Sequence, residues 1–386
     1  MSATREPTEA IAKRICLCIV GTRPEAIKMA PVIAALKNCG WATPYVVTTG
    51  QHEDIVVAPL LLFNVRPNQN LSIERETGSL NEFFGKAILA LDAVIERMRP
   101  DCLVAQGDTT SVAAASVAAF QRRVPFIHVE AGLRTGIIDE PFPEEMNRRI
   151  ASLCASLHCA PTQLAYANLV AEGIDKRNCV ITGNTVIDAL MHVANTDPET
   201  PANFPASPKV ILATAHRREN FGAPLEKSLK GLRMAIDAHP DLALFFVAHP
   251  NPRAHRPVYR LLSDHPRIVV TESIDYASLV AALKHSWAVV TDSGGLQEEA
   301  PALGKPVLVL RDVTERPEAV SAGAVRIVGL ESRDVFEAIS ELHEDNGLYA
   351  RMSVPVFPYG DGHAAKRVVA SIHRLLQKQQ RDAALN

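Results

Sequence analysis

Short apolar runs rich in β-branched residues recur along this 386-residue chain, and stretches with helical spacing separate one run from the next. The first half contains ICLCIV, PYVVTT, CLVAQ, PFIHVE, SLHCA and CVIT, and the second contains KVILATA, LALFFVA, RIVVT, WAVVT, PVLVL and AVRIV. Runs of this length are typical of strands buried on both faces, as in parallel sheets covered by helices. The alternation therefore predicts an α/β protein with layers of helices around parallel sheets.

A polar, proline-rich segment, NTDPETPANFPASPK at 195–209, separates the two sets of runs and is typical of a linker. The chain is also long for a single domain. We therefore expect two Rossmann-like parallel-sheet domains, at 1–195 and 205–362, with a cleft between them. The last segment, 363–382, has the pattern of an amphipathic helix, and we expect it to pack back on the first domain.

Composition and charge exclude several classes of function. A net charge of −3 and a pI near 6.5 argue against a general nucleic-acid binder, although a local basic pocket for one anionic metabolite is compatible with them. No segment is long and apolar enough to span a bilayer, and the polar start MSATREPTEAIAKR is unlike a signal peptide. We therefore expect a cytoplasmic protein without membrane or nucleic-acid partners.

Cofactor and metal fingerprints are missing from the sequence. The seven cysteines include no C-x-x-C pair and the thirteen histidines lack metal-ligand spacing, so we expect buried free thiols and no metal site. The dinucleotide-type glycine pattern GDGHAA follows no predicted strand, and no G-x-x-x-x-G-K-[ST] occurs. We therefore expect no nicotinamide or ATP cofactor.

Two predicted strands lead into glycine turns at the start of a helix. After WAVVT, Ser293 and Gly294 open a helix whose free N–H groups and positive dipole end suit an anion. After ICLCIV, the segment GTRPEAIKMAP places Arg23 and Lys28 close to another helix start. A simple turn and ordinary surface charges are the structural alternatives. The two turns favour phosphate sites for a nucleotide that is itself the substrate.

Carboxylates and histidines stand at other predicted strand ends, where ligands bind in open parallel sheets. Asp108 follows CLVAQ and Glu130 ends PFIHVE, and two acids in one cleft form an arrangement used for general acid–base chemistry. Glu144 begins a predicted helix in PFPEEMNRR, where complementing the helix dipole is an equally good explanation. His216 and His249 end two strands of the second half, and a lone histidine in such a place is more often structural.

Several long motifs resemble those of the non-hydrolysing UDP-N-acetylglucosamine 2-epimerases. They are GTRPEAIKMAP, GDTTS, HVEAGLRTG, PFPEEMNRR, TGNTVIDAL, HRRENFG, TDSGGLQEEAPALGKPVLVLRDVTERPEAV and PYGDG. The resemblance covers nearly the whole chain. It implies a GT-B fold and an enzyme that interconverts UDP-GlcNAc and UDP-ManNAc without a cofactor. It also implies a role in cell-surface polysaccharide synthesis and a homodimer.

The resemblance implies roles for single residues as well. By similarity, Asp108, Glu130 and Glu144 carry the proton chemistry at C2 of the sugar. His216 assists at the same catalytic site. Which carboxylate serves which face of the sugar stays open. UDP and substrate binding falls to another set: Arg23, Lys28, Ser293, Gly294, Glu299 and Arg316. Within that set, the resemblance places Glu299 on the ribose hydroxyls.

Some family members bind UDP-GlcNAc at a second, activating position. Three residues of this chain match that position: Gln51, Arg217 and His249. The chain departs from the family pattern at other positions, because Asp54 replaces a common glutamine, Arg75 is offset from an expected arginine and Leu279 replaces a frequent phenylalanine. These departures leave substrate activation open.

Four alternatives stand beside the epimerase at this point. A hydrolysing epimerase, which releases UDP and ManNAc, is disfavoured by the intact GTRPEAIKMAP. A GT-B glycosyltransferase would leave three carboxylates without a role. A sensor that binds UDP-GlcNAc without turnover has no need for a proton acceptor near C2. An epimerase of a modified UDP-hexosamine is compatible with the motifs.

Overall fold

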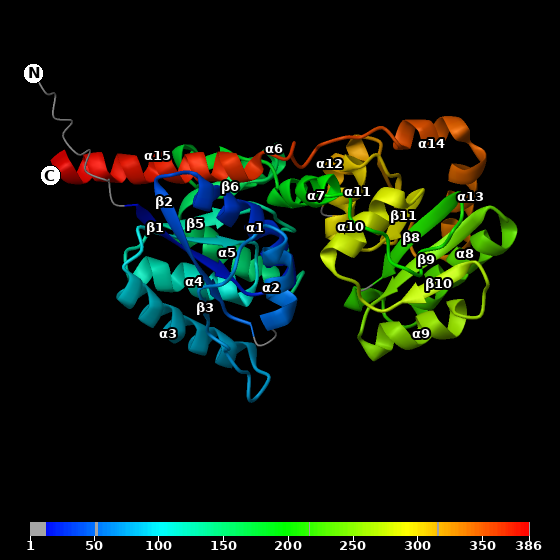
Figure 1. Ribbon diagram of the computed structural model, residues 1–386, viewed down its shortest axis with the longest axis horizontal. Coiled ribbons are helices and arrows are strands. Elements are labelled where there is room, and N and C mark those ends of the chain that lie inside the picture. The colour runs from blue at the N-terminus through cyan, green and yellow to red at the C-terminus, as the bar shows by residue number, and fades with distance from the viewer. Residues whose placement is uncertain (1–12, 51–52, 216, 315, 386) are drawn as a thin grey trace, which may run out of the picture. The chain divides into compact units, whose positions relative to one another are not determined.

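The computed structural model describes residues 13–50, 53–215, 217–314 and 316–385 (Figure 1). The chain forms two compact units: unit 1 comprises Met1–Thr185 and Ala365–Asn386, and unit 2 comprises Val186–Ala364. The division falls at Thr185, ahead of the proline-rich segment at 195–209. Each unit has its own sheet and its own hydrophobic core.

Unit 1 contains a seven-stranded parallel sheet in the order β3-β2-β1-β4-β5-β6-β7. The strands are β1 (Arg14–Val20), β2 (Ala42–Thr48), β3 (Gln69–Asn70), β4 (Cys102–Gln106), β5 (Phe126–Val129), β6 (Ala155–Ala160) and β7 (Cys179–Ile181). The helices are α1 (Arg23–Asn38), α2 (Glu53–Leu61), α3 (Leu80–Met98), α4 (Thr110–Gln121), α5 (Glu144–Cys154), α6 (Gln163–Ala171) and α15 (Ala364–Leu385). The strand order reverses between β1 and β4, which is where ligands bind in sheets of this type.

The central strand β1 is buried on both faces, which explains why its sequence is one continuous apolar run. Cys16 and Cys18 point into a core shared with α1, α2 and α15, whereas Leu17 and Ile19 point into a core shared with α3 and α4. Helix α15 places Ile372 and other apolar residues in the first of these cores. The end of the chain is therefore an integral part of unit 1.

Unit 2 contains a six-stranded parallel sheet in the order β10-β9-β8-β11-β12-β13. The strands are β8 (Lys209–Ala215), β9 (Leu242–Ala248), β10 (Ile268–Thr271), β11 (Ala288–Thr291), β12 (Val307–Val309) and β13 (Val325–Ile327). The helices are α7 (Thr185–Asn195), α8 (Ala223–Ala238), α9 (Pro252–Leu262), α10 (Tyr276–His285), α11 (Gly294–Ala302), α12 (Pro317–Ser321), α13 (Ser332–Glu344) and α14 (Asn346–Met352). Its strand order reverses between β8 and β11.

The predicted α/β architecture with parallel sheets is confirmed, and every apolar run quoted from the sequence contains a strand. Strand β3 was not predicted, because its two residues, Gln69 and Asn70, are polar and only extend the sheet edge beside β2. In the described part of the chain, no helix has the length and apolar character needed to cross a lipid bilayer. Within the same ranges, no group of three or more His, Cys, Asp or Glu side chains is arranged to hold a metal ion.

Candidate functional site

Two of the predicted acids follow neighbouring strands of the unit 1 sheet. Asp108 comes after β4 and the left-handed Gly107, and Glu130 comes directly after β5, which pairs with β4. Glu130 itself has φ of 63°, a conformation that is uncommon for a residue with a side chain and that clusters at functional sites. The parallel register brings both acids to the carboxyl edge of one sheet.

The tip of β4 is held by side chains from two other elements. Arg148 of α5 donates from Nε to Asp108 Oδ2 at 2.8 Å, and Asn147 Nδ2 donates to the Asp108 carbonyl at 2.9 Å. His128 of β5 lies with Nε2 2.8 Å from the Gly107 carbonyl. Burial lowers the pKa of His128 to about 4, so the ring is neutral and donates to that carbonyl. The Asp108 carboxylate is therefore fixed next to a positive charge.

Glu130 has a cation partner as well. Lys28 Nζ lies 2.6 Å from Glu130 Oε2, and both side chains are largely buried. Gln106 Nε2 donates to Glu130 Oε2 at 2.9 Å. Lys28 was predicted to bind substrate, and the structure places its ammonium group on the carboxylate of another predicted site residue.

Glu144 differs from the other two acids in its surroundings. It is the first residue of α5, and among the described residues its buried Oε2 has no hydrogen-bond partner. Arg148 lies one turn after Glu144 on the same helix. The ion pair between Arg148 and Asp108 therefore connects Asp108 to the helix that carries Glu144. Buried polar atoms are nearly always paired, so a free carboxylate oxygen here is an available group for a ligand.

The start of α1 supplies a further buried acid. Glu25 closes a capping box with Thr22, and Arg23 is the first residue of the helix. Glu25 is buried, and its other carboxylate oxygen accepts a hydrogen bond from Thr109, the residue after Asp108. The cations of α1 and the acid at the tip of β4 are thus linked through one carboxylate.

In unit 2, a glycine helix start carries an arginine. Ser293 is the N-cap of α11, and a Cβ placed on Gly294 would lie 2.6 Å from Arg316 Cζ. Arg316 Nε donates to Glu298 Oε1 at 2.7 Å, and both side chains are largely buried. Gly294 is required because the guanidinium occupies the space of a side chain. The result is a positive group held at the positive end of a helix, which suits an anion.

Glu299 lies on the same helix, one turn from its start. It is 6% exposed and accepts a 2.7 Å hydrogen bond from the hydroxyl of the buried Tyr276. Tyr276 begins α10, so two helices fix the position of this carboxylate.

The loop after β8 meets the tip of β11. The fully buried Asp292 accepts hydrogen bonds from the Arg217 backbone N–H at 2.9 Å and from Asn220 Nδ2 at 3.1 Å. His249 follows β9, and its Nδ1 accepts from the Asn251 N–H at 3.1 Å. Arg217 is thus brought to the Ser293 turn. Gln51 and His216 lie outside the described residues.

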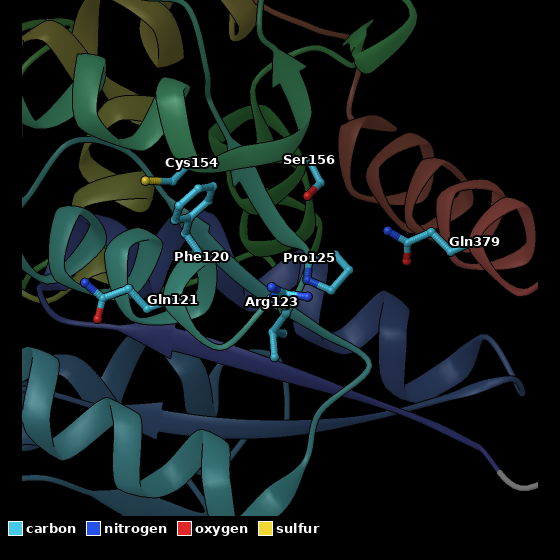
Figure 2. A pocket seen from close by; sticks show the side chains of 8 residues that line it. Phe120, Gln121, Arg123, Pro125, Cys154, Ser156 and Gln379 are labelled. Atoms are coloured by element: carbon cyan, nitrogen blue, oxygen red, sulfur yellow. The ribbon is translucent and has the colours of Figure 1, made fainter. Parts of the chain in front are cut away.

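A pocket of about 450 Å³ in unit 1 contains none of the predicted site residues (Figure 2). Pro125 and Ser156 line it, and they stand at the beginnings of β5 and β6. The pocket therefore lies near the amino ends of the strands, whereas Asp108 and Glu130 follow the carboxyl ends.

The partners of the predicted acids were not predicted from the sequence. Arg148 stands in PFPEEMNRR, one turn after Glu144, and that spacing is a usable signal. Glu25 completes the pattern T-x-x-E, which indicates a capping box. Gln106 stands two residues before Asp108, and this closeness is a signal of the same kind. Nothing in the sequence around Tyr276 indicates its contact with Glu299.

Comparisons with known proteins identify the family of this chain. The family model for UDP-N-acetylglucosamine 2-epimerase matches residues 34–373. The chain belongs to the UDP-N-acetylglucosamine 2-epimerase family. The UDP-N-acetylglucosamine 2-epimerase of Escherichia coli (strain K12) is 40% identical over 366 residues, which cover 92% of this chain and 97% of the relative.

Solved structures support the same family and the fold. The UDP-GlcNAc 2-epimerase from Neisseria meningitidis, solved bound to UDP-GlcNAc, matches with a TM-score of 0.89 and 40% identity, covering 93% of this chain and all of that one. A glycosyltransferase of kitacinnamycin matches with a TM-score of 0.63 at 15% identity, which shows the fold alone. The epimerase-family chain therefore has the predicted GT-B-like fold of two Rossmann-like units.

Proposed function

We propose that this chain is a non-hydrolysing UDP-GlcNAc 2-epimerase that interconverts UDP-GlcNAc and UDP-ManNAc without a cofactor. The observation that carries the proposal is the group of acids of unit 1. Asp108 and Glu130 follow neighbouring strands, each beside a cation, and Arg148 ties Asp108 to the helix of Glu144. A sensor or a simple binding protein has no need for three such acids.

The reaction inverts C2 without net oxidation. A base removes the C2 proton, the electron pair forms a C1=C2 double bond, and the C1–O bond to UDP breaks to give 2-acetamidoglucal and UDP. A UDP oxygen then adds back to C1, and a proton returns to C2 from the opposite face. Such a route needs separate acid–base groups near C2 and stabilisation of the departing diphosphate.

Unit 1 supplies the proton chemistry in this proposal. Asp108, Glu130 and Glu144 act at C2, with His216 assisting. Glu144 is supported by its buried, unpartnered Oε2 within the described chain, because that oxygen is available to the sugar. Lys28 pairs with Glu130 and Arg148 pairs with Asp108. These two cations offset the repulsion between the two carboxylates at one edge of the sheet.

Unit 2 supplies the nucleotide contacts. Ser293, Gly294 and Arg316 hold the diphosphate at the start of α11, and Glu299, held by Tyr276, accepts from the ribose hydroxyls. The pre-positioned guanidinium supports this role, since Arg316 needs no rearrangement to meet a phosphate. A second set completes the proposed contacts: Arg23 and Lys28 on the substrate, and Gln51, Arg217 and His249 at an activating UDP-GlcNAc position.

The setting of the enzyme is part of the same proposal. We propose a cytoplasmic homodimer that supplies ManNAc-type sugars for cell-surface polysaccharide, as the sequence resemblance implies.

The test is to incubate the purified protein with UDP-GlcNAc and no added cofactor, and to separate the products by anion-exchange chromatography. We expect an equilibrium mixture of UDP-GlcNAc and UDP-ManNAc. Free ManNAc with UDP would identify a hydrolysing enzyme instead. Unchanged UDP-GlcNAc, also at high concentrations that would fill an activating site, would overturn the assignment.

A further inference from the structure

Glu25 makes an unusually complete set of contacts for a side chain that the reaction does not require. Its Oε2 accepts hydrogen bonds from the Gly21 and Thr22 N–H groups, both at 2.6 Å. Its Oε1 accepts from the Thr109 hydroxyl at 2.5 Å. The carboxylate therefore joins the turn after β1 to the residue that follows Asp108.

Thr109 uses its hydroxyl for this link and not for its own helix. It is the N-cap of α4, yet its side chain makes no capping hydrogen bond there. N-cap threonines ordinarily accept from the N–H groups of the first helical turn. The contact to Glu25 thus replaces the usual local role of the side chain.

The Glu25 carboxylate is costly for the folded protein. Burial raises its pKa to about 7, and the hydrogen bonds from Thr109, Gly21 and Thr22 only partly oppose that shift. The nearby charge of Asp108 raises the pKa of Glu25 further. The folded protein therefore holds the Glu25 proton more tightly than the unfolded chain does. The contribution of this proton to the free energy of unfolding is complete below the pKa of the unfolded chain and is lost as the pH rises through about 7.

We infer that Glu25 is a positioning residue that, through Thr109, holds Asp108 at a fixed place relative to the cations of α1. The expected effect on kcat rests on the proposed function. The expected effect on the structure around Asp108 rests on the geometry alone. A misplacement of about 1 Å at a reacting group can lower a rate about a hundredfold, so a link of this kind acts on turnover more than on affinity.

A matched control exists elsewhere in unit 1. Glu82 of α3 accepts from the Glu76 and Thr77 N–H groups and from the Thr77 hydroxyl, the same pattern that Glu25 makes. Glu82 is only partly buried, with 18% of its side chain exposed, and unlike Glu25 it pairs with a lysine, Lys86. Hydrogen bonds from Lys86 and Thr77 lower the pKa of Glu82 to about 2. Its stability contribution is present above the unfolded pKa and is lost as the pH falls, which is the opposite sign to Glu25.

The experiment compares Thr109→Val and Glu25→Gln with Thr77→Val and Glu82→Gln. Valine has the shape of threonine, and the Thr109 side chain makes no capping hydrogen bond that the change would remove.

We expect each site variant to lower kcat about tenfold or more, with KM and the UDP dissociation constant within about threefold of wild type, because the displaced group, Asp108, acts on the sugar. The double variant should fall no further than the worse single variant, because both break one link. The two control variants should keep kcat within about twofold of wild type, since they lie outside the site.

Two further readouts separate this inference from the proposed function. Hydrogen exchange of the peptide at 106–112 should be faster in both site variants than in wild type and unchanged in the controls, whether or not the enzyme is an epimerase. Relative to wild type, the unfolding midpoint of Glu25→Gln should rise more at pH 8 than at pH 5. Unchanged exchange, or a loss of kcat that follows a lowered midpoint, would overturn the positioning role. An inert wild-type enzyme with faster exchange in the variants would overturn only the proposed function.

Discussion

The two units place their proposed ligand-binding groups at the same edge of an α/β sheet and use opposite charges there. In unit 1, carboxylates stand at the strand tips and cations hold them, as in the pairs of Asp108 with Arg148 and Glu130 with Lys28. In unit 2, a cation stands at a helix start and a carboxylate holds it, as in Arg316 with Glu298. In the proposed function, the same α/β frame carries acid–base chemistry in one unit and anion binding in the other, because function lies in the side chains placed on a fold.

The largest expected effect breaks the unit 1 half of this comparison. Asp108→Asn keeps the shape of the side chain and removes its charge, so we expect kcat to fall by about 10²–10⁴. The UDP dissociation constant should stay within a few fold, because the side chain acts on the sugar. Asp101→Asn is the matched control, since Asp101 pairs with Arg14 just before the amino end of the same strand. Unchanged turnover of Asp108→Asn, measured by product chromatography, would refute the role.

The next effect breaks the unit 2 half. Arg316→Ala should weaken UDP binding by about 1–3 kcal/mol, because it removes a charge-assisted contact to phosphate. Arg326→Ala removes another arginine of unit 2, one that is exposed and pairs with the exposed Glu341 of α13, and should leave UDP affinity unchanged. Calorimetric titration of UDP checks both. Because Arg316→Ala leaves Glu298 buried without its partner, the unfolding midpoint is measured on the same sample. Full UDP affinity in a folded Arg316→Ala would contradict the assignment.

A smaller effect sharpens the account of the glycine turn. A methyl group on Gly294 would meet the Arg316 guanidinium at 2.6 Å, whereas a methyl group on Gly295 would lie 3.6 Å from its nearest neighbour, Glu299 Oε2. Gly294→Ala should therefore displace Arg316 and cost about 1–2 kcal/mol of UDP affinity, within the range seen for overpacking. Gly295→Ala should have little effect. Equal UDP dissociation constants for the two variants would show that the guanidinium position is unimportant.

The smallest effect concerns the ribose contact. Tyr276→Phe removes the hydroxyl that donates to Glu299 and should weaken UDP binding by about 0.5–1.5 kcal/mol, with a smaller loss for 2′,3′-dideoxy-UDP. Tyr259→Phe is the control, because its hydroxyl contacts the exposed Glu272. Equal losses for UDP and its dideoxy analogue would separate Tyr276 from ribose recognition.

The fold was predictable from the sequence because buried parallel strands are apolar runs, and the strand-end positions of Asp108 and Glu130 were predictable because both acids follow such runs. Their partners were not readable in the same way. Lys28 and Glu130 are 102 positions apart, and only the strand order of the sheet brings them together. Glu25 looks like a routine helix cap in sequence, and its burial against Thr109 follows from the packing of α1 beside β4. Strand β3 lacked any apolar signal.

The most direct test of the central claim is proton NMR of the wild-type enzyme and Asp108→Asn with UDP-GlcNAc in deuterated water. If unit 1 acids remove the C2 proton, the UDP-ManNAc formed by wild type carries deuterium at C2, and Asp108→Asn shows neither exchange nor product. UDP-ManNAc that retains its C2 proton, or exchange at the wild-type rate in Asp108→Asn, would contradict the account.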